Sequence, residues 1–316
     1  MLANLLQDVR YALHGFALRP MFAAVVVLTL AVGIGVNVAV FSMFDQIMLR
    51  ELPVARPSEL VNVVSPGPRY GKQVGNQQGG QDENFSYPLF RDLEDAGESY
   101  VDLEASWIAQ VSLRNGDSTV RTSAVLVSGG YFAALGVGPE LGRVLGEQDV
   151  VDTQPAASVM LSFDYWTTVF GADPDVLGKT LFVSGRPLEI VGVAPRGFVG
   201  TTPGQNISVF APLTVEWYRD AGQSTPIIED RAFSYVYVFG RLQPGVAREE
   251  AEGRLNTTFR GLITDVELPA AAATGAELDE LEGLSGRTLS LAPGARGQRY
   301  APPRTPLAVF FAAAAT

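Results

Sequence analysis

The sequence predicts an α+β protein in which one N-terminal membrane helix leads to a mixed α/β domain outside the membrane, divided into two subdomains. Three observations support this fold class. Met21 to Phe44 is a run of 24 residues without a charge. Between residues 52 and 303, short strand and helix patterns alternate without the regular strand–helix–strand repeat of a parallel sheet. With 316 residues and 47% apolar content, the chain can also bury a substantial core.

Residues 20–48 are predicted to form the membrane helix. As a helix the uncharged run spans about 36 Å, and the hydrocarbon core of a bilayer is about 30 Å thick. A cleaved signal peptide is the competing interpretation, but its apolar region is usually about 7 to 15 residues long and ends at a small-residue cleavage site. Because Arg10 and Arg19 precede the run, the positive-inside rule places the N-terminus in the cytoplasm and the acidic remainder outside.

The membrane helix carries a stripe of small residues. Ala31, Gly35 and Ala39 recur every fourth residue, which would let another helix approach closely. Asn37 adds an amide at membrane depth that should bond to protein rather than lipid. We therefore expect these four residues to pack against other membrane helices, the alternative being a lone anchor that tolerates them. Residues 1–19 are predicted to be a cytoplasmic amphipathic segment, which either lies in the membrane interface or extends the membrane helix.

The first half of the outer domain, residues 49–303, has clear local signals. "LVNVVSPG" predicts a strand, and the polar "RYGKQVGNQQGGQDEN" that follows predicts a flexible loop. Ser86 is placed to begin a helix that Gly97 ends. Two β-rich runs meet at Asn115-Gly116, the strongest short hairpin signal in the chain. "SGGYFAALGVG" predicts a short helix that ends at a glycine.

The second half continues in the same style. "ASVMLSFDYWTTVFG" predicts a buried strand that enters a helix capped by Ser162 and closed at Gly171. A second hairpin turns at Ser184-Gly185, and "AFSYVYVFGRLQPGV" predicts an alternating strand. "AREEAEGRLNTTFRGL" has the apolar spacing of an amphipathic helix. After these elements, the apolar residues 304–316 predict the start of a second membrane helix, cut before it can cross a bilayer.

Composition excludes several classes of function. The net charge of −11 and the lack of a basic stripe argue against nucleic-acid binding. The chain has no cysteine and a single histidine, His14, which lies before the membrane helix, so His-based zinc sites and Ser-His-Asp catalysis are not expected. We predict no catalytic residues, no cofactor and no bound metal. In particular, Asp82 and Glu83 lack the spacing of a calcium loop.

Three further patterns can each be interpreted as a functional site or as an ordinary structural feature. The acids group as Asp92/Glu94/Asp95, Asp173/Asp175 and Glu249/Glu250/Glu252, and solvated surface is expected rather than a two-carboxylate glycosidase site. The aromatics Trp107, Trp166, Trp217, Tyr235 and Tyr237 would line either a groove or the core, and core packing is favoured for Trp166.

The third pattern is "GADPDVLGKTLFV", which contains the Gly-Lys-Thr triplet of a phosphate-binding loop. Asp173 occupies the position of the required first glycine. The segment also follows a helix and opens a hairpin, whereas a phosphate loop opens a helix. We therefore predict a turn and no ATP site, with Lys179 as a surface charge.

Together these segments resemble one family. "DVRYALHGFALRPMFAAVVVLTLAVGIGVNVAVFSMFDQIMLRELP" is similar to the first helix of MacB/FtsX-type ABC transporter permeases, especially the MacB-like permeases of Acidobacteria. The rest resembles their periplasmic core domain, in the family's order, through "FSYPLFRDL", "VSGGYFAALGVGPELGRVLGEQD", "VMLSFDYWTTVFGADPDVLGKTLFVSGRPLEIVGVAPRGFVGTTPG" and "GRLQPGV". The resemblance covers nearly the whole chain.

The resemblance implies a function without enzymatic chemistry in this chain. It implies a bacterial inner-membrane permease whose N-terminus is cytoplasmic and whose core domain is periplasmic. It also implies an ABC ATPase subunit as partner, whose ATP hydrolysis the domain couples to export or to mechanical work on a periplasmic or membrane substrate. Other permease helices or a second permease copy would complete the membrane part, and MacB itself adds a periplasmic adaptor and an outer-membrane channel. The alternative is a single-pass, membrane-anchored periplasmic binding or sensor domain.

Overall fold

A computed structural model describes residues 20–44, 50–75, 78, 81–116, 118–150, 157–215 and 226–298. The predicted segments 1–19 and 304–316, and Trp217, lie outside the described residues. The chain divides into two compact units, residues 1–50 and residues 51–316. Each unit is described by itself.

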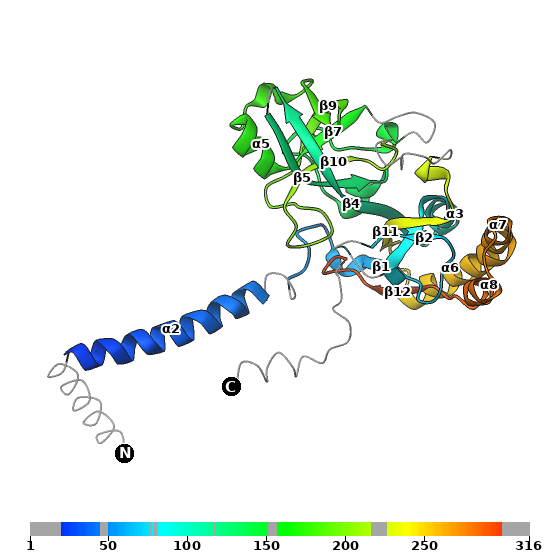
Figure 1. The fold of residues 1–316 in the computed structure, drawn as a ribbon, viewed down its shortest axis with the longest axis horizontal. Helices are drawn as coiled ribbons and strands as arrows, with labels where there is room; N and C mark the ends of the chain where they lie inside the picture. Colours follow the sequence, from blue (N-terminus) through cyan, green and yellow to red (C-terminus); the bar gives the residue numbers. More distant parts are fainter. Residues whose placement is uncertain are drawn as a thin grey trace, which may run out of the picture. The chain divides into compact units, whose positions relative to one another are not determined.

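The first unit contains the predicted membrane helix. Helix α2 runs from Pro20 to Phe44 (Figure 1). Its residues Pro20–Ala39 have a mean hydropathy of 2.4, so by length and composition the helix can cross a membrane. Helical geometry places Ala31, Gly35 and Ala39 along one side. What this side packs against stays a prediction.

The second unit is built on one continuous mixed sheet. Among the described residues, the hydrogen-bonded order is β12-β1-β11-β4-β5-β10-β7-β9-β6, with β2 and β3 on β11 and β8 bridging β4 and β9. Most pairs are antiparallel, as expected for an α+β domain. The strands are β1 (Leu60–Val64), β2 (Lys72–Gln73), β3 (Asn84–Ser86), β4 (Val101–Asn115), β5 (Ser118–Val127), β6 (Leu141–Gly142), β7 (Ser158–Leu161), β8 (Thr180–Val183), β9 (Arg186–Val193), β10 (Ile207–Pro212), β11 (Phe233–Leu242) and β12 (Ser290–Pro293).

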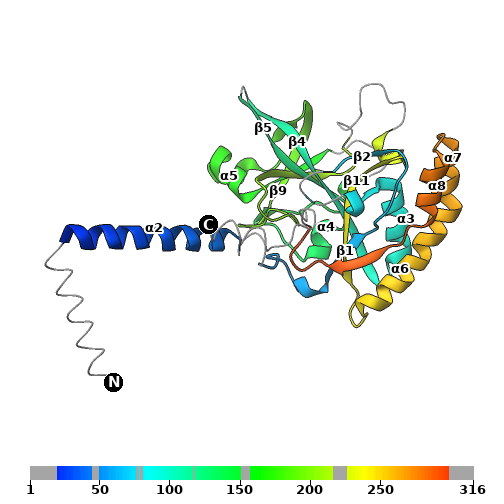
Figure 2. The same cartoon turned by 60° about the horizontal axis from the view of Figure 1, so that its bottom comes forward.

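Helices lie on both faces of this sheet. The α-helices of the second unit are α3 (Tyr87–Gly97), α4 (Tyr131–Leu135), α5 (Phe163–Phe170), α6 (Arg248–Leu262), α7 (Leu268–Ala273) and α8 (Leu278–Ser285), with a π-helical turn, η8 (Ile263–Glu267), between α6 and α7. The 3-10 turns are η2 (Pro57–Glu59), η3 (Gln81–Glu83), η4 (Glu147–Asp149), η5 (Pro174–Val176) and η7 (Ile227–Glu229). Figure 2 shows α3 and α6 on one side of β1 and β11 and α4 on the other.

Two clusters of buried apolar side chains pack against the two faces of the sheet. The larger joins α3 and α6, through residues such as Phe90 and Phe259, to the sheet. The smaller lies under α4, where Tyr131 and Phe132 meet Phe210. Figure 1 shows β7, β9, β10 and α5 gathered at one end of the sheet and β1, β11 and β12 at the other, with β4 and β5 running between them. The two expected subdomains therefore share one sheet.

The local signals of the sequence are confirmed where they were strongest. Ser86 accepts a hydrogen bond from the Leu89 amide at the start of α3, and Ser162 accepts one from the Tyr165 amide at the start of α5. The β4–β5 hairpin turns beyond Asn115, and β8 and β9 turn at Ser184-Gly185, where both residues have positive φ.

Two expectations were wrong in detail. Residues 69–84 were expected to form a flexible loop, yet Arg69, Gln78 and Asn84 are buried. Gln78 Oε1 accepts a hydrogen bond from the Ile108 amide at 2.7 Å, which ties this segment to β4. Strand β11 was expected to alternate between core and solvent, but nine of its ten residues are buried because both faces of the sheet are covered there.

Candidate functional site

The suspected phosphate loop is a turn whose lysine and amides are already engaged. Lys179 Nζ lies 2.9 Å from Asp173 Oδ2, and this hydrogen bond helps to hold the pKa of Asp173 below its ordinary value. The amides of Gly178 and Lys179 donate to the carbonyls of Ile190 and Val176. Strand β8, rather than a helix, follows at Thr180. The donors that a phosphate would require are therefore already used within the protein.

The acidic residues that cluster in the sequence have different surroundings in the structure. Asp92 forms an ion pair with Arg231 at 2.7 Å, and Glu252 accepts a hydrogen bond from the Leu291 amide. Asp173 accepts hydrogen bonds within the turn described above. Glu94 and Asp95 instead line a cleft together with carboxylates that are distant in sequence. Within the described part of the chain, no three His, Asp or Glu side chains are placed to hold one metal ion.

The described aromatics belong to the core. Trp107 stacks on Tyr237, with ring centroids 6.4 Å apart, and meets Tyr235 edge-on at 5.8 Å. All three are buried. Trp166 is half-buried against the same core, and its Nε1 donates to the Asp173 carbonyl at 2.9 Å. Core packing, which the sequence favoured for Trp166, is therefore confirmed.

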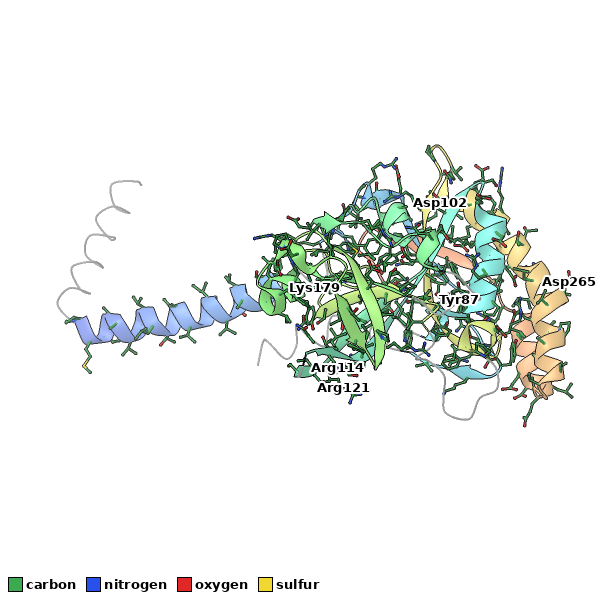
Figure 3. All side chains as sticks on the ribbon, turned by 90° about the horizontal axis from the view of Figure 1, so that it is seen from above. Tyr87, Asp102, Arg114, Arg121, Lys179 and Asp265 are labelled. Carbon is green, nitrogen blue, oxygen red and sulfur yellow. The ribbon has the colours of Figure 1, made fainter. Side chains whose placement is uncertain are left out.

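A cleft lies where β4 is longer than its neighbour. Strand β5 pairs with β4 only as far as Val127 opposite Ser106, while β4 continues along β11 to Val101. The edge of β4 beyond Ser106 is flanked by α3 and by the start of α4, which leaves a cleft of about 610 Å³. Six carboxylates and three guanidinium groups line it: Glu94, Asp95, Glu98, Asp102, Glu104 and Glu147, with Arg56, Arg91 and Arg241. Figure 3 shows Asp102, from this cleft, and Lys179 on different parts of the domain.

Glu104 forms the floor of the acidic cleft. It is only 6% exposed, and its Oε2 accepts a hydrogen bond from Ser128 Oγ. Ser128 Oγ is itself held by the Ala105 amide at 2.8 Å. Burial raises the pKa of Glu104 to about 8, with the Ser128 hydrogen bond acting in the opposite direction. At neutral pH this side chain is therefore mostly protonated.

Two glycines let carboxylates approach the backbone closely. A Cβ on Gly130 would overlap Glu104 Oε1, and a Cβ on Gly129 would overlap the carboxylate of Glu147. The φ of Gly130 is −85°, which any residue can adopt, so contact rather than backbone conformation requires the glycine. This explains the second glycine of the "SGG" that precedes α4, because Glu104 is buried, whereas Glu147 is exposed.

The guanidinium group of Arg241, which lines the cleft, is engaged in holding the fold. Arg241 donates to the carbonyls of Ala55, Arg56 and Ala134 and forms an ion pair with Glu59 at 3.0 Å. It therefore ties the segment before β1 to the end of α4.

Strand β4 also carries a partly buried carboxylate at the rim. Asp102 accepts a hydrogen bond from Gln243 at 2.7 Å, and burial together with the nearby Glu98 raises its pKa.

The sequence grouped only Glu94 and Asp95 of this cleft, because Glu98 follows the end of α3 and the others lie on β4 and η4. The one local signal for the rest was the isolated glutamate in the strand pattern "VDLEASW", which puts a charge among apolar residues.

Comparison with known proteins now decides the family. The model of the MacB-like periplasmic core domain matches residues 23–258, about three quarters of the chain. The chain belongs to this family. Residues 23–258 are thus a MacB-like periplasmic core domain in the sense of this family, and the first matched residues lie in the apolar helix α2.

Individual relatives of this MacB-like domain are distant. Over 130 residues the chain is 28% identical to "Macrolide export ATP-binding/permease protein MacB 1" of Aeromonas hydrophila, a match covering 41% of this chain and 20% of that protein. The match therefore spans about a fifth of that relative's length. A domain of a putative permease from Porphyromonas gingivalis shares the fold, with a TM-score of 0.51 at 18% identity, covering 83% of this chain and 99% of that one. The periplasmic region of MacB from Actinobacillus actinomycetemcomitans gives a TM-score of 0.47 at 17% identity, covering 70% and 95%.

Proposed function

We propose that this chain is the N-terminal part of an ABC transporter permease that couples ATP hydrolysis in the cytoplasm to export or mechanical work outside it. The observation that carries the proposal is the continuous family match from residue 23, within α2, to residue 258, within α6. The match includes residues of both the apolar helix and the sheet domain, which supports a permease in which the two occur together.

The chain is proposed to depend on ATP without binding it. The Gly-Lys-Thr segment donates its amides and its lysine to the protein itself. ATP hydrolysis is assigned to an ABC ATPase subunit, or to a domain joined to the permease as in the name of the Aeromonas relative. Other permease helices or a second permease copy would pack on the Ala31, Gly35 and Ala39 side of α2. Asn37 lies on the opposite side of the helix and would bond to a further protein segment there. A periplasmic adaptor and an outer-membrane channel are proposed as further partners, because the family match is to a MacB-like domain.

The location is proposed to be the bacterial inner membrane, with the N-terminus in the cytoplasm and the domain in the periplasm. These 316 residues contain no cysteine, so one introduced cysteine reports its own side of the membrane. We expect a membrane-impermeant maleimide to label Val120→Cys, at a half-exposed site on β5, in intact spheroplasts. Asn4→Cys should be labelled only after lysis. Labelling of Asn4→Cys in intact spheroplasts would show that the N-terminus lies outside the membrane and would contradict the proposed orientation.

Co-purification tests the function. The natural gene product, solubilised from its membrane, is expected to carry an ABC ATPase whose activity changes when the residue 51–298 domain is deleted. The competing function, a single-pass sensor or binding domain, is favoured by the acidic cleft. The competing function would be supported if the product has one membrane span, carries no ATPase and is unaffected by the deletion. The same result would refute the proposed permease function.

A further inference from the structure

The hairpin of β4 and β5 leaves part of one strand edge open. Strand β5 pairs with β4 along its whole length. On its other side it pairs with β10 only from Ser123 onward. No other strand that the structure describes lies along that side of residues 118–122. Residues 118–121 are exposed, so the first part of β5 is a free edge about 13 Å long.

The pairing pattern shows which backbone groups face this free edge. The Ser112 carbonyl accepts a hydrogen bond from the Ser184 amide at 2.7 Å, so the backbone groups of Ser112 point away from β5. In an antiparallel pair, the residue opposite such a position also points away from its partner. Arg121 lies opposite Ser112, and Thr119 occupies the next equivalent position, opposite Arg114. The N–H and C=O groups of Thr119 and Arg121 therefore face the free edge and can bond to one more strand.

Two arginines give this edge a positive charge on a chain whose net charge is −11. Arg114 and Arg121 are diagonal neighbours on one face of the hairpin (Figure 3). The guanidinium carbon of Arg114 lies 3.8 Å from the centre of the Phe182 ring. Neither arginine forms an ion pair with a residue that the structure describes, and Asp117 of the turn lies outside those residues. This local charge complements an acidic partner.

The other face of the free edge is apolar. Val120 lies on the face opposite to Arg121, because neighbouring side chains of a strand alternate. It pairs with Leu113, which is buried, but Val120 itself is 51% exposed. A strand added to β5 would cover Val120 with one face and would meet the arginines with the other. Such a strand should therefore alternate apolar and acidic residues.

We propose that residues 118–121 bind an extended, acidic segment of a partner protein, which adds to β5 as a short strand. Its backbone bonds to Thr119 and Arg121. Its carboxylates face the two arginines, and its apolar side chains cover Val120. A second copy of this chain does not fit, because pairing two of these edges would bring arginines close to one another. The charges that oppose pairing between copies therefore also select the partner.

The proposal goes beyond the permease function and is tested separately, because binding to the folded domain requires no ATPase. The probe is the peptide fluorescein-Thr-Glu-Val-Glu-Val-Thr-amide, titrated with the full 316-residue chain in a neutral detergent while fluorescence polarisation is recorded. We expect saturable binding that weakens at least about tenfold in Arg121→Glu. Arg260→Glu makes the same charge change at an exposed site on α6 and should leave the affinity unchanged.

Modified peptides distinguish strand addition from attraction between charges, and they need no protein variant. A glutamate opposite Arg121 shares its face and exchanges backbone hydrogen bonds with it, whereas the valine nitrogens point away from β5. Methylating the two glutamate nitrogens should therefore abolish binding, and methylating the two valine nitrogens should not. Replacing both glutamates by lysine should abolish binding as well. Hydrogen exchange, measured by mass spectrometry, should slow at residues 118–121 when the unmodified peptide binds.

Four results would overturn the proposal. Equal affinity of the two methylated peptides, or equal weakening in Arg121→Glu and Arg260→Glu, would show that charge alone attracts the peptide. The absence of saturable binding by the unmodified peptide would show that the edge is not a binding site. Self-association of the wild-type chain that Arg121→Glu abolishes, measured by sedimentation velocity, would show that a second copy occupies the edge.

Discussion

Replacing Glu104 by glutamine should make the protein more stable in a way that depends on pH. Glutamine keeps the size of the side chain and can accept the Ser128 hydrogen bond, but it cannot ionise. The wild-type carboxyl has a pKa of about 8 in the folded protein against an ordinary value of 4.5. The folded state therefore holds this proton more tightly than the unfolded state does.

The sign and size of the effect follow from proton linkage. Below pH 4.5 both states are protonated and Glu104 has no effect on the pH dependence. As pH rises from 4.5 to 8, the unfolded state ionises first, so the free energy of unfolding falls by about 1.4 kcal/mol per pH unit. Over the accessible range of about pH 5 to 8 we expect the wild type to lose about 2–4 kcal/mol relative to Glu104→Gln.

Urea denaturation of both proteins at several pH values measures this difference directly. Other groups with raised pKa values, such as Glu83 and Glu267, titrate in both proteins and cancel in the comparison. Glu250→Gln serves as the control, because its exposed side chain pairs only with Arg254 among the described residues and should change stability by less than about 0.5 kcal/mol at any pH. A gap between wild type and Glu104→Gln that stays constant across this pH range would refute the reasoning.

Three further predictions use the same matched design. Gly130→Ala should lower the free energy of unfolding by about 1–3 kcal/mol, because its Cβ overlaps a buried carboxylate, whereas Gly138→Ala, with nothing within 4 Å, should not; thermal melts compare them. Lys179→Ala should leave ATP affinity undetectable in an equilibrium binding assay, as in the wild type, and Lys179-dependent binding would contradict the turn assignment. Gly35→Leu should weaken co-purification of the other membrane helices more than Gly33→Leu, which lies off the small-residue stripe. Equal recovery of both variants would mean that the stripe faces lipid.

The sequence predicted the elements whose signals are local. Ser86 and Ser162 cap helices because a hydroxyl next to the free amides of a first helical turn is a short-range arrangement. Ser184-Gly185 makes a hairpin in which both residues adopt positive φ, a conformation that glycine adopts readily and that signals a short turn in the sequence. The family resemblance rested on these same segments.

The remainder depends on contacts that no local pattern reveals. Gln78 belongs to a polar stretch that composition assigns to solvent, yet its amide oxygen bonds to the Ile108 backbone and its nitrogen to Ser106. Strand β4 supplies a partner for the oxygen and one for the nitrogen, which offsets the cost of burying this amide. Similarly, the sequence of β11 predicts a strand with one solvent-exposed face, but α3 and α4 cover opposite faces of the sheet.

The acidic cleft shows most clearly what a one-dimensional pattern omits. The hairpin signal at Asn115 gives the turn, but it does not say that β5 ends at Val127 while β4 continues to Val101. Because of this mismatch, β5 does not cover the edge of β4 at Glu104, and the acidic cleft lies along that edge. A buried carboxylate there opposes folding at neutral pH, and an apolar side chain would not. Glu104 therefore lowers the stability of the folded protein at neutral pH, and its carboxyl lines a cleft instead of packing within the apolar core.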